Sequence, residues 1–100
     1  MLKIEKKNEK EAIVFQLEGR LDTVTAPELE EELQKVLPEA KELVLDLEKL
    51  DYISSAGLRV FLSAQKIMMK QGSMKVTHVN EMIKEIFEVT GFADLLDIEE

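Results

Sequence analysis

A nearly continuous apolar segment, ELVLDL at residues 42–47, stands between two longer segments whose apolar residues repeat at helical spacing. After its first residue only Asp46 interrupts it, and such a run is typical of a central strand covered on both faces. Strands that alternate with helices form parallel sheets joined by crossovers. The sequence therefore predicts an α/β fold built around a central strand at residues 42–47.

The segment before this strand, residues 25–38, is predicted to be a helix. Thr25 and Glu28 have the spacing of a capping box, and Pro27 falls in the first turn, where its missing N–H is tolerated. The apolar residues of the segment share one helical face: Leu29, Leu33, Val36 and Leu37.

A second helix is predicted at residues 56–71, apolar except for one narrow polar stripe. The stripe residues follow one another at steps of four, three and four: Arg59, Ser63, Lys66 and Lys70. Gly72 suits the left-handed residue that often follows a helix end. A third helix is predicted after Asn80, which can cap it, and Gly91 is expected to end it.

Four further segments are predicted to be strands: residues 2–7, 11–19, 73–79 and 95–98. The first two are expected to form an antiparallel hairpin. The order is then β-β-α-β-α-β-α-β, which predicts a mixed, mostly parallel sheet of four to five strands with three or more helices. Three helices are too few to cover both faces of five strands, so one face is expected to be only partly covered.

The length of 100 residues predicts a single domain over residues 1–100. The net charge of −8 argues against a nucleic-acid partner. The apolar runs are too short for a membrane span, and the charged N-terminal segment lacks an apolar signal core. A cytoplasmic protein with no membrane partner is therefore expected. The absence of cysteine excludes disulfides and thiolate metal sites.

Enzyme motifs are incomplete or missing. Around Ser55 the glycine that a hydrolase elbow needs two residues earlier is replaced by Ile53, although Gly57 is present. Phosphate-loop and dinucleotide motifs do not occur, and a zinc site lacks its cysteines or histidine pair. We therefore expect no enzyme, no cofactor and no metal, while a hydrolase using Ser55 stays as a remote alternative.

The titratable residues add little support for catalysis. His78 is the only histidine and falls within a predicted strand. Asp22, Asp46 and Asp51 could gather at one end of the sheet, but three acids among 21 carboxylates are weak evidence for acid–base chemistry.

Two adjacent serines, Ser54 and Ser55, lie in the segment YISSAGLRVF, residues 52–61, where a strand is expected to end and the second helix to begin. Ser54 or Ser55 can be a helix N-cap whose oxygen accepts a backbone N–H. Either could also accept a phosphate, because a helix N-terminus favours negative charge. A phosphate there adds almost two charges without melting the helix and alters any docked surface.

The segments GRLDTVTAPELEEEL (residues 19–33) and ELVLDLEKLDYISSAGLRVFLSAQK (residues 42–66) resemble the STAS domain family. Within it, they resemble the bacterial anti-sigma factor antagonists of the SpoIIAA and RsbV type. The resemblance covers nearly the whole chain and implies the SpoIIAA-like STAS fold.

The resemblance implies a phosphoprotein that regulates transcription by partner switching. In this family the unmodified antagonist binds an anti-sigma factor that is also an ATP-dependent serine kinase, and this binding frees the sigma factor. Phosphorylation of one serine ends the binding, and a PP2C-type phosphatase resets it. The alternative is a STAS scaffold or sensor subunit of a lipid-transport or stress-signalling assembly, without a phosphoswitch.

The family pattern D-S-[ST]-G-L, matched on Gly57 and Leu58, implies that the phosphoacceptor is Ser55, with Ser54 as the second choice. Ser54 stands where the family has an aspartate, and Ala56 takes the next hydroxyl position.

Asp22 in GRLD matches the family's other acidic residue near the phosphosite. Met68 and Met69 could extend the partner surface, although core packing explains them better. The partner-binding residues expected from the resemblance are Asp22, Thr23, Ser54, Ser55, Ala56, Gly57, Leu58 and Arg59.

Overall fold

The computed structural model describes residues 2–99 and contains one five-stranded sheet in the spatial order β1-β2-β3-β4-β5. β1 (Leu2–Glu9) pairs antiparallel with β2 (Ala12–Leu21). β3 (Glu42–Ile53), β4 (Ser73–Thr77) and β5 (Ile98–Glu99) follow β2 in parallel pairs. The predicted mixed, mostly parallel sheet with an antiparallel first strand is confirmed.

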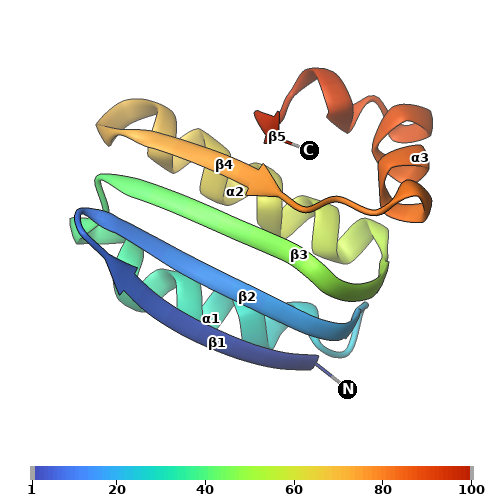
Figure 1. Cartoon of the computed structure of the whole chain (residues 1–100), viewed down its shortest axis with the longest axis horizontal. Helices are drawn as coiled ribbons and strands as arrows, with labels where there is room; N and C mark the ends of the chain where they lie inside the picture. Colours follow the sequence, from blue (N-terminus) through green and yellow to red (C-terminus); the bar gives the residue numbers. More distant parts are fainter. Residues whose placement is uncertain (1, 100) are drawn as a thin grey trace.

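The helices are distributed unequally over the sheet. α1 (Ala26–Val36) and α2 (Ser55–Gln71) lie together on one face, and α3 (Glu81–Thr90) lies beside the carboxyl end of β4 (Figure 1). Within residues 2–99 the other face carries no helix, which agrees with the expectation that one face is only partly covered. The expectation that residues 42–47 are covered on both faces is therefore wrong, and Val44 and Asp46 remain partly exposed.

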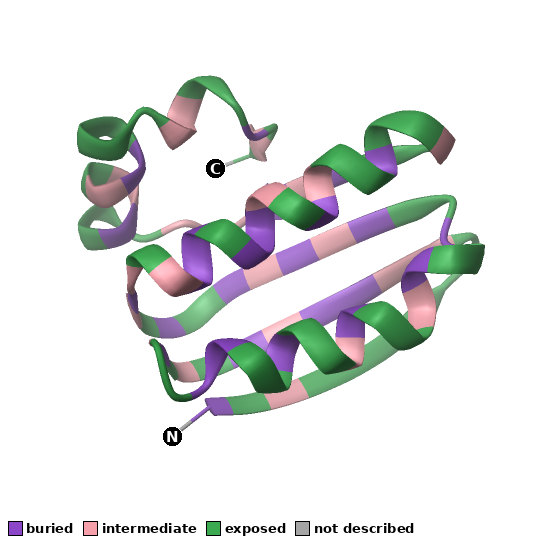
Figure 2. Cartoon of the chain, turned by 180° about the vertical axis from the view of Figure 1, so that it is seen from behind, coloured by how far each residue is buried: buried purple, intermediate pink, exposed green. Residues whose placement is uncertain are grey.

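The hydrophobic core lies between the sheet and the inward sides of α1 and α2 (Figure 2). Its fully buried residues include large side chains from every layer: Phe15 and Leu17 of β2, Leu45 of β3, Leu29 of α1, and Phe61 of α2. The predicted apolar faces of both helices are confirmed. The stripe of Arg59, Ser63, Lys66 and Lys70 is exposed on the outer side of α2.

β3 is six residues longer than predicted. Its pairing with β2 shifts register twice, between Gln16 and Glu18 and between Gly19 and Arg20, so that β3 contributes an extra residue each time. A bulge of this kind twists and bends the strand locally. The extended β3 carries its end to the carboxyl end of β2, where α2 begins.

The ends of the other elements match the sequence only in part. Asn80 caps α3 by accepting the Ile83 N–H at 2.9 Å, and Gly91 follows it with φ +84°, both as predicted. Gly72 is not left-handed, since its φ of 179° is extended. A Cβ there would lie 1.9 Å from the Lys41 carbonyl oxygen, so the glycine permits a close approach of two backbones.

The strands differ modestly from the expected bounds. β1 runs two residues further, β4 ends two residues earlier, and β5 has only two residues. No helix among residues 2–99 is long and apolar enough to cross a membrane.

Candidate functional site

The carboxyl ends of β2 and β3 meet at one edge of the sheet. Leu21 and Ile53 are paired across the two strands, and the Ser54 N–H donates to the Leu21 carbonyl oxygen at 2.8 Å. The loop that follows β2 and the first turn of α2 are therefore neighbours. This junction brings Asp22 and the two serines to the same edge.

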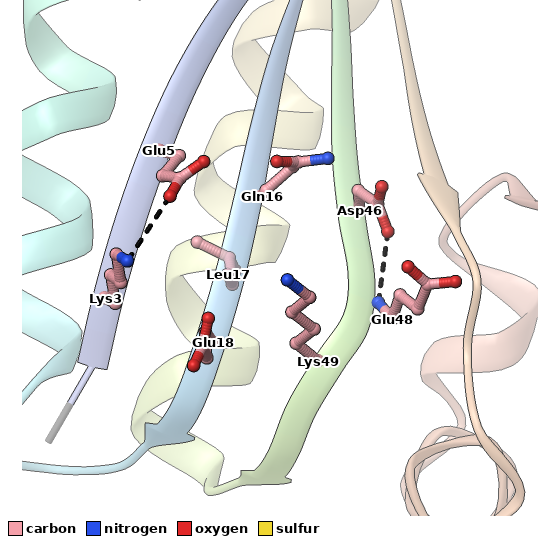
Figure 3. Close-up of a pocket in the computed structure, with 8 residues that line it drawn as sticks. All are labelled: Lys3, Glu5, Gln16, Leu17, Glu18, Asp46, Glu48 and Lys49. Atoms are coloured by element: carbon pink, nitrogen blue, oxygen red, sulfur yellow. Dashed lines mark hydrogen bonds and ion pairs between the residues drawn. The ribbon is translucent and has the colours of Figure 1, made fainter.

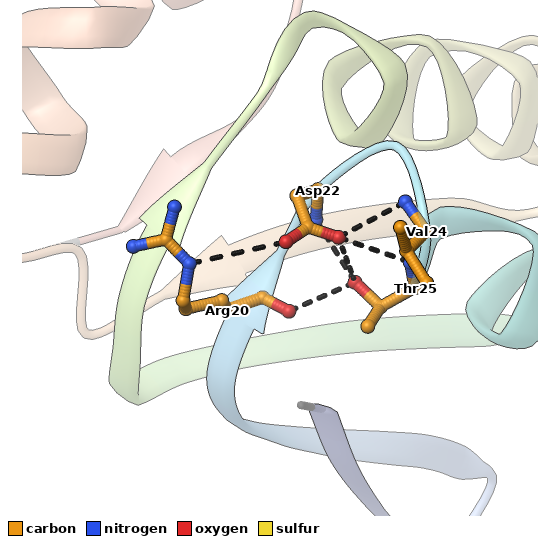
Figure 4. Close-up of polar contacts among 4 residues, drawn as sticks. All are labelled: Arg20, Asp22, Val24 and Thr25. Atoms are coloured by element: carbon orange, nitrogen blue, oxygen red, sulfur yellow. Dashed lines mark hydrogen bonds and ion pairs between the residues drawn. The ribbon is translucent and has the colours of Figure 1, made fainter.

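The loop of residues 22–25 is held by its own hydrogen bonds (Figure 4). Asp22 Oδ1 accepts the N–H groups of Val24 at 3.0 Å and Thr25 at 3.1 Å. The Thr25 hydroxyl accepts the Asp22 N–H at 2.9 Å and donates to the Arg20 carbonyl oxygen at 2.8 Å. These reciprocal bonds fix the turn that leads into α1.

The electrostatics of Asp22 follow from the same bonds. The hydrogen bond from the Thr25 N–H is the main cause that holds the pKa of Asp22 below its usual value. The Val24 N–H and the Arg20 charge lower this pKa further, whereas partial burial raises it. The predicted capping box is wrong, because Thr25 makes no cap bond to its helix. Its hydroxyl is engaged by Asp22 and Arg20 instead.

Arg20 stacks on an aromatic ring beside this loop. Its guanidinium carbon lies 4.4 Å from the ring centroid of Tyr52, its cross-strand partner, and its Nε lies 3.8 Å from Asp22 Oδ2. The stacking orients the guanidinium more than the long ion pair does. Sequence analysis missed this contact, because the bulges in β3 hide the pairing of Arg20 with Tyr52.

The two serines have different environments. Ser54 is the N-cap residue of α2, and its carbonyl oxygen accepts the Leu58 N–H at 3.0 Å. The Ser54 hydroxyl makes no cap bond; it is buried and has no partner among the described residues. Ser55 is the first residue of α2 and is exposed. Ser55 is thus the more exposed of the two residues, and the Ser54 hydroxyl is closed to an approaching protein in this conformation.

The rest of the motif divides between packing and surface. Gly57 and Leu58 are buried in the chain on its own, and the expectation that they contact a partner stays a prediction. A Cβ on Gly57 would lie 2.7 Å from Leu21 Cγ, so this glycine lets α2 pack against the end of β2. Ala56 is half-buried and Arg59 is exposed.

A shallow groove between α1 and α2 begins at this edge. Thr23, which is exposed, lies at its loop end. The groove is lined by small or apolar residues and by a few polar ones: Thr23, Ala26, Pro27, Glu30, Ala56, Arg59, Val60 and Ser63. It extends the predicted site along both helices.

Sequence analysis also missed an exposed apolar residue at the site. Val24 is 79% exposed, although its N–H is fixed by Asp22. The exposure of Val24 could not be predicted from the sequence, because a single apolar residue in a polar loop forms no periodic pattern. The two methionines differ, since Met68 is fully buried in the core and Met69 is 72% exposed.

A second polar cluster lies on the helix-free face of the sheet. The prediction that His78 lies within a strand is wrong, because His78 follows β4 with φ +56°. Its Nδ1 lies 3.0 Å from Asp46 Oδ1. The same oxygen accepts the Glu48 N–H at 3.0 Å. Asp46 is thus engaged apart from the Asp22 loop, which removes support for a gathering of the three aspartates.

A charged depression on this face does not resemble a ligand site. It lies over β1, β2 and β3, with Lys3, Glu5, Glu18 and Lys49 around it (Figure 3). It encloses about 30 Å³, room for a water molecule or two. Within residues 2–99 no group of three or more histidine, cysteine, aspartate or glutamate residues is arranged to hold a metal ion.

Comparison with known proteins agrees with this fold. The family model described as the STAS domain matches residues 3–100. The anti-sigma-B factor antagonist of Bacillus subtilis is 34% identical over 94 residues, which cover 93% of this chain and 85% of that protein.

Solved structures show the same fold. An anti-sigma factor antagonist from Mycobacterium paratuberculosis has a TM-score of 0.91 at 21% identity, covering 98% of this chain and 85% of that one. SpoIIAA from Bacillus, in its unphosphorylated form, has a TM-score of 0.76 at 14% identity, covering 100% of this chain and 88% of that one. Since the family model spans almost the entire sequence, the chain belongs to the STAS domain family.

Proposed function

We propose that this chain is a cytoplasmic anti-sigma factor antagonist controlled by phosphorylation. The unmodified chain binds an anti-sigma factor that is also a serine kinase, and the sigma factor is released. The Ser55 oxygen then takes the γ-phosphoryl group of ATP, its hydroxyl proton is lost and ADP leaves. The phosphorylated chain no longer binds, and a PP2C-type phosphatase restores it by hydrolysis.

The observation that carries the proposal is the exposed Ser55 at the first position of α2. A kinase needs the acceptor oxygen at the surface, whereas the Ser54 oxygen is buried. Phosphate at this position meets the free N–H groups and the positive end of the helix dipole. The relatives named as antagonists support the role, and SpoIIAA has been solved in both unphosphorylated and phosphorylated forms.

Phosphosite mapping tests the proposal. Each anti-sigma factor kinase encoded in the source genome is purified and incubated with ATP and the chain. Trypsin then releases the peptide of residues 50–59 for mass spectrometry. We expect one phosphate on Ser55 and a weaker complex after modification. Ser55→Ala should bind without being modified, and Ser54→Ala should still be phosphorylated. Full modification of Ser55→Ala would show that the acceptor assignment is wrong.

A STAS scaffold or sensor without a phosphoswitch is the second candidate. It is favoured by Ser54, which stands where the family has an aspartate and so removes a negative charge beside the acceptor. If no kinase modifies the chain while a control antagonist is modified in parallel, this second candidate replaces the first. Copurification with a transporter ATPase would then identify the assembly.

A further inference from the structure

Arg59 is an exposed cation without a partner. Among residues 2–99 its side chain forms no ion pair, hydrogen bond or ring contact, whereas Lys6, Lys35 and Lys75 are paired with glutamates. The chain has 21 acidic and 13 basic residues, yet no described carboxylate pairs with Arg59. Its five N–H donors remain available to an external anion.

The position of Arg59 on α2 relates it to Ser55. The two residues are four apart in one helix, and both are exposed. Side chains at this spacing are neighbours on one helix face, with Cβ atoms about 5–6 Å apart. A long helical side chain generally leans towards the helix N-terminus, so we expect the Arg59 side chain to reach back towards Ser55. A phosphate on Ser55 therefore falls within reach of the guanidinium.

Arg59 also lines the groove between α1 and α2. It is the only basic residue among the groove's lining residues, and Glu30 is the only acidic one. The guanidinium fork matches the oxygens of carboxylate and phosphate equally well. A partner that docks in the groove can thus place a carboxylate on Arg59. Glu30 repels a partner carboxylate at its own position in the groove.

We propose that Arg59 is the anion contact of the docking surface, shared between two ligands. In the unmodified chain it binds a carboxylate of the anti-sigma factor kinase. In the phosphorylated chain it binds the Ser55 phosphate and is no longer available to the kinase. Phosphorylation then weakens the complex by removing an attractive contact as well as by adding repulsion. This inference rests on the proposed function.

The intramolecular half can be tested without any kinase. Phosphoserine is installed at position 55 during synthesis, and the ³¹P resonance is followed against pH at low salt. Arg59→Gln should raise the midpoint of the second phosphate ionisation by about 0.3–0.5 pH unit, because a neighbouring cation favours the dianion. Lys66→Gln also removes one positive charge from the polar stripe of α2, and it should change the ionisation midpoint much less. Equal midpoints in the wild type and Arg59→Gln would overturn this half.

The docking half is tested with the kinase that phosphorylates the wild type. Arg59→Gln should weaken binding of the unmodified chain roughly tenfold, Arg59→Lys less, and Lys66→Gln less than twofold. Unchanged affinity of Arg59→Gln would overturn it. Failure of the wild type to bind any kinase would instead overturn the proposed function and the docking half with it. Thermal melts confirm that these exposed substitutions leave the fold intact.

Discussion

At the scale of single residues, Asp22 acts through hydrogen bonds more than through free charge. Its carboxylate accepts two backbone N–H groups of the loop, and Thr25 and Arg20 complete the arrangement. The loop is therefore ordered before any partner arrives. An ordered docking loop lowers the entropy that binding must overcome.

A pH-dependent comparison of the wild type with Asp22→Asn tests this role. Because folding lowers the pKa of Asp22 from 3.8, its ionised form stabilises the native state above pH 3.8. This contribution is lost as the pH falls through the lower folded-state pKa. The difference in urea midpoint between the two proteins should thus be constant from pH 5 to 7 and shrink below pH 3.8. A difference that does not change with pH would contradict the assignment.

Val24 provides a second prediction at this scale. Its exposed side chain belongs to the Asp22 loop, whose backbone is held by Asp22, so burial of that side chain against the kinase should contribute to affinity. Val24→Thr keeps the shape and loses apolar surface, and it should weaken the complex about fivefold. Val89→Thr on α3 is the matched control, since Val89 is 81% exposed and distant in sequence. Equal effects of both changes, measured by calorimetry, would exclude a specific role.

At the scale of elements, β3 explains where sequence reasoning stopped. Its buried residues alternate up to Leu47 and then come at steps of three, at Leu50 and Ile53. This spacing follows from the two extra residues that β3 inserts opposite β2. Period-two reasoning therefore ended the strand at residue 47. The order of elements was predictable, because each helix and each strand start has its own local pattern.

The place of the candidate site in the chain was predictable for the same reason, since it too has a local sequence pattern. Ser54 and Ser55 belong to one contiguous motif at a helix start, and the resemblance to the family pointed to them. The stacking of Arg20 on Tyr52 depends on the strand register, and the orientation of Thr25 depends on Asp22. Contacts of this kind come from tertiary pairing, which local patterns do not encode.

Two glycines give a prediction about how the elements pack. A Cβ on Gly57 would press on the side chains of Leu21 and Ile53, and one on Gly72 would strike the Lys41 backbone. Side chains can shift more easily than backbone. Gly57→Ala should therefore lower the free energy of unfolding by about 1 kcal/mol after the gain in helix propensity, and Gly72→Ala by about 3 kcal/mol.

Urea unfolding of the two glycine variants provides the measurement. Ser63→Ala, an exposed change on the same helix, is the control and should be neutral or slightly stabilising. If Gly72→Ala proves as stable as Ser63→Ala, the close approach of Gly72 to Lys41 does not matter for stability. The opposite order of the two glycine variants would indicate that the core around Gly57 is the stiffer region.

At the scale of the whole molecule, the site and the rest of the fold are separable. The serines and the Asp22 loop lie at one edge of the sheet, and the core is closed beneath them by buried Leu21, Ile53 and Leu58. A new charge at this edge meets solvent and a helix N-terminus without entering the core. Modification can then change what the surface binds while the domain stays folded.

The phosphorylated domain should therefore keep its fold and its stability. Phosphate on Ser55 makes the net charge more negative, from −8 to about −10, which adds repulsion. Favourable interaction with the start of α2, about 0.3–1 kcal/mol at low salt, opposes it. We expect the melting midpoint to stay constant or rise by up to about 5 °C, with less change at high salt. Amide shifts should change around residues 22–25 and the first turns of α2. A fall of several degrees, or shifts spread over β1 and α3, would mean that phosphate acts by loosening the domain.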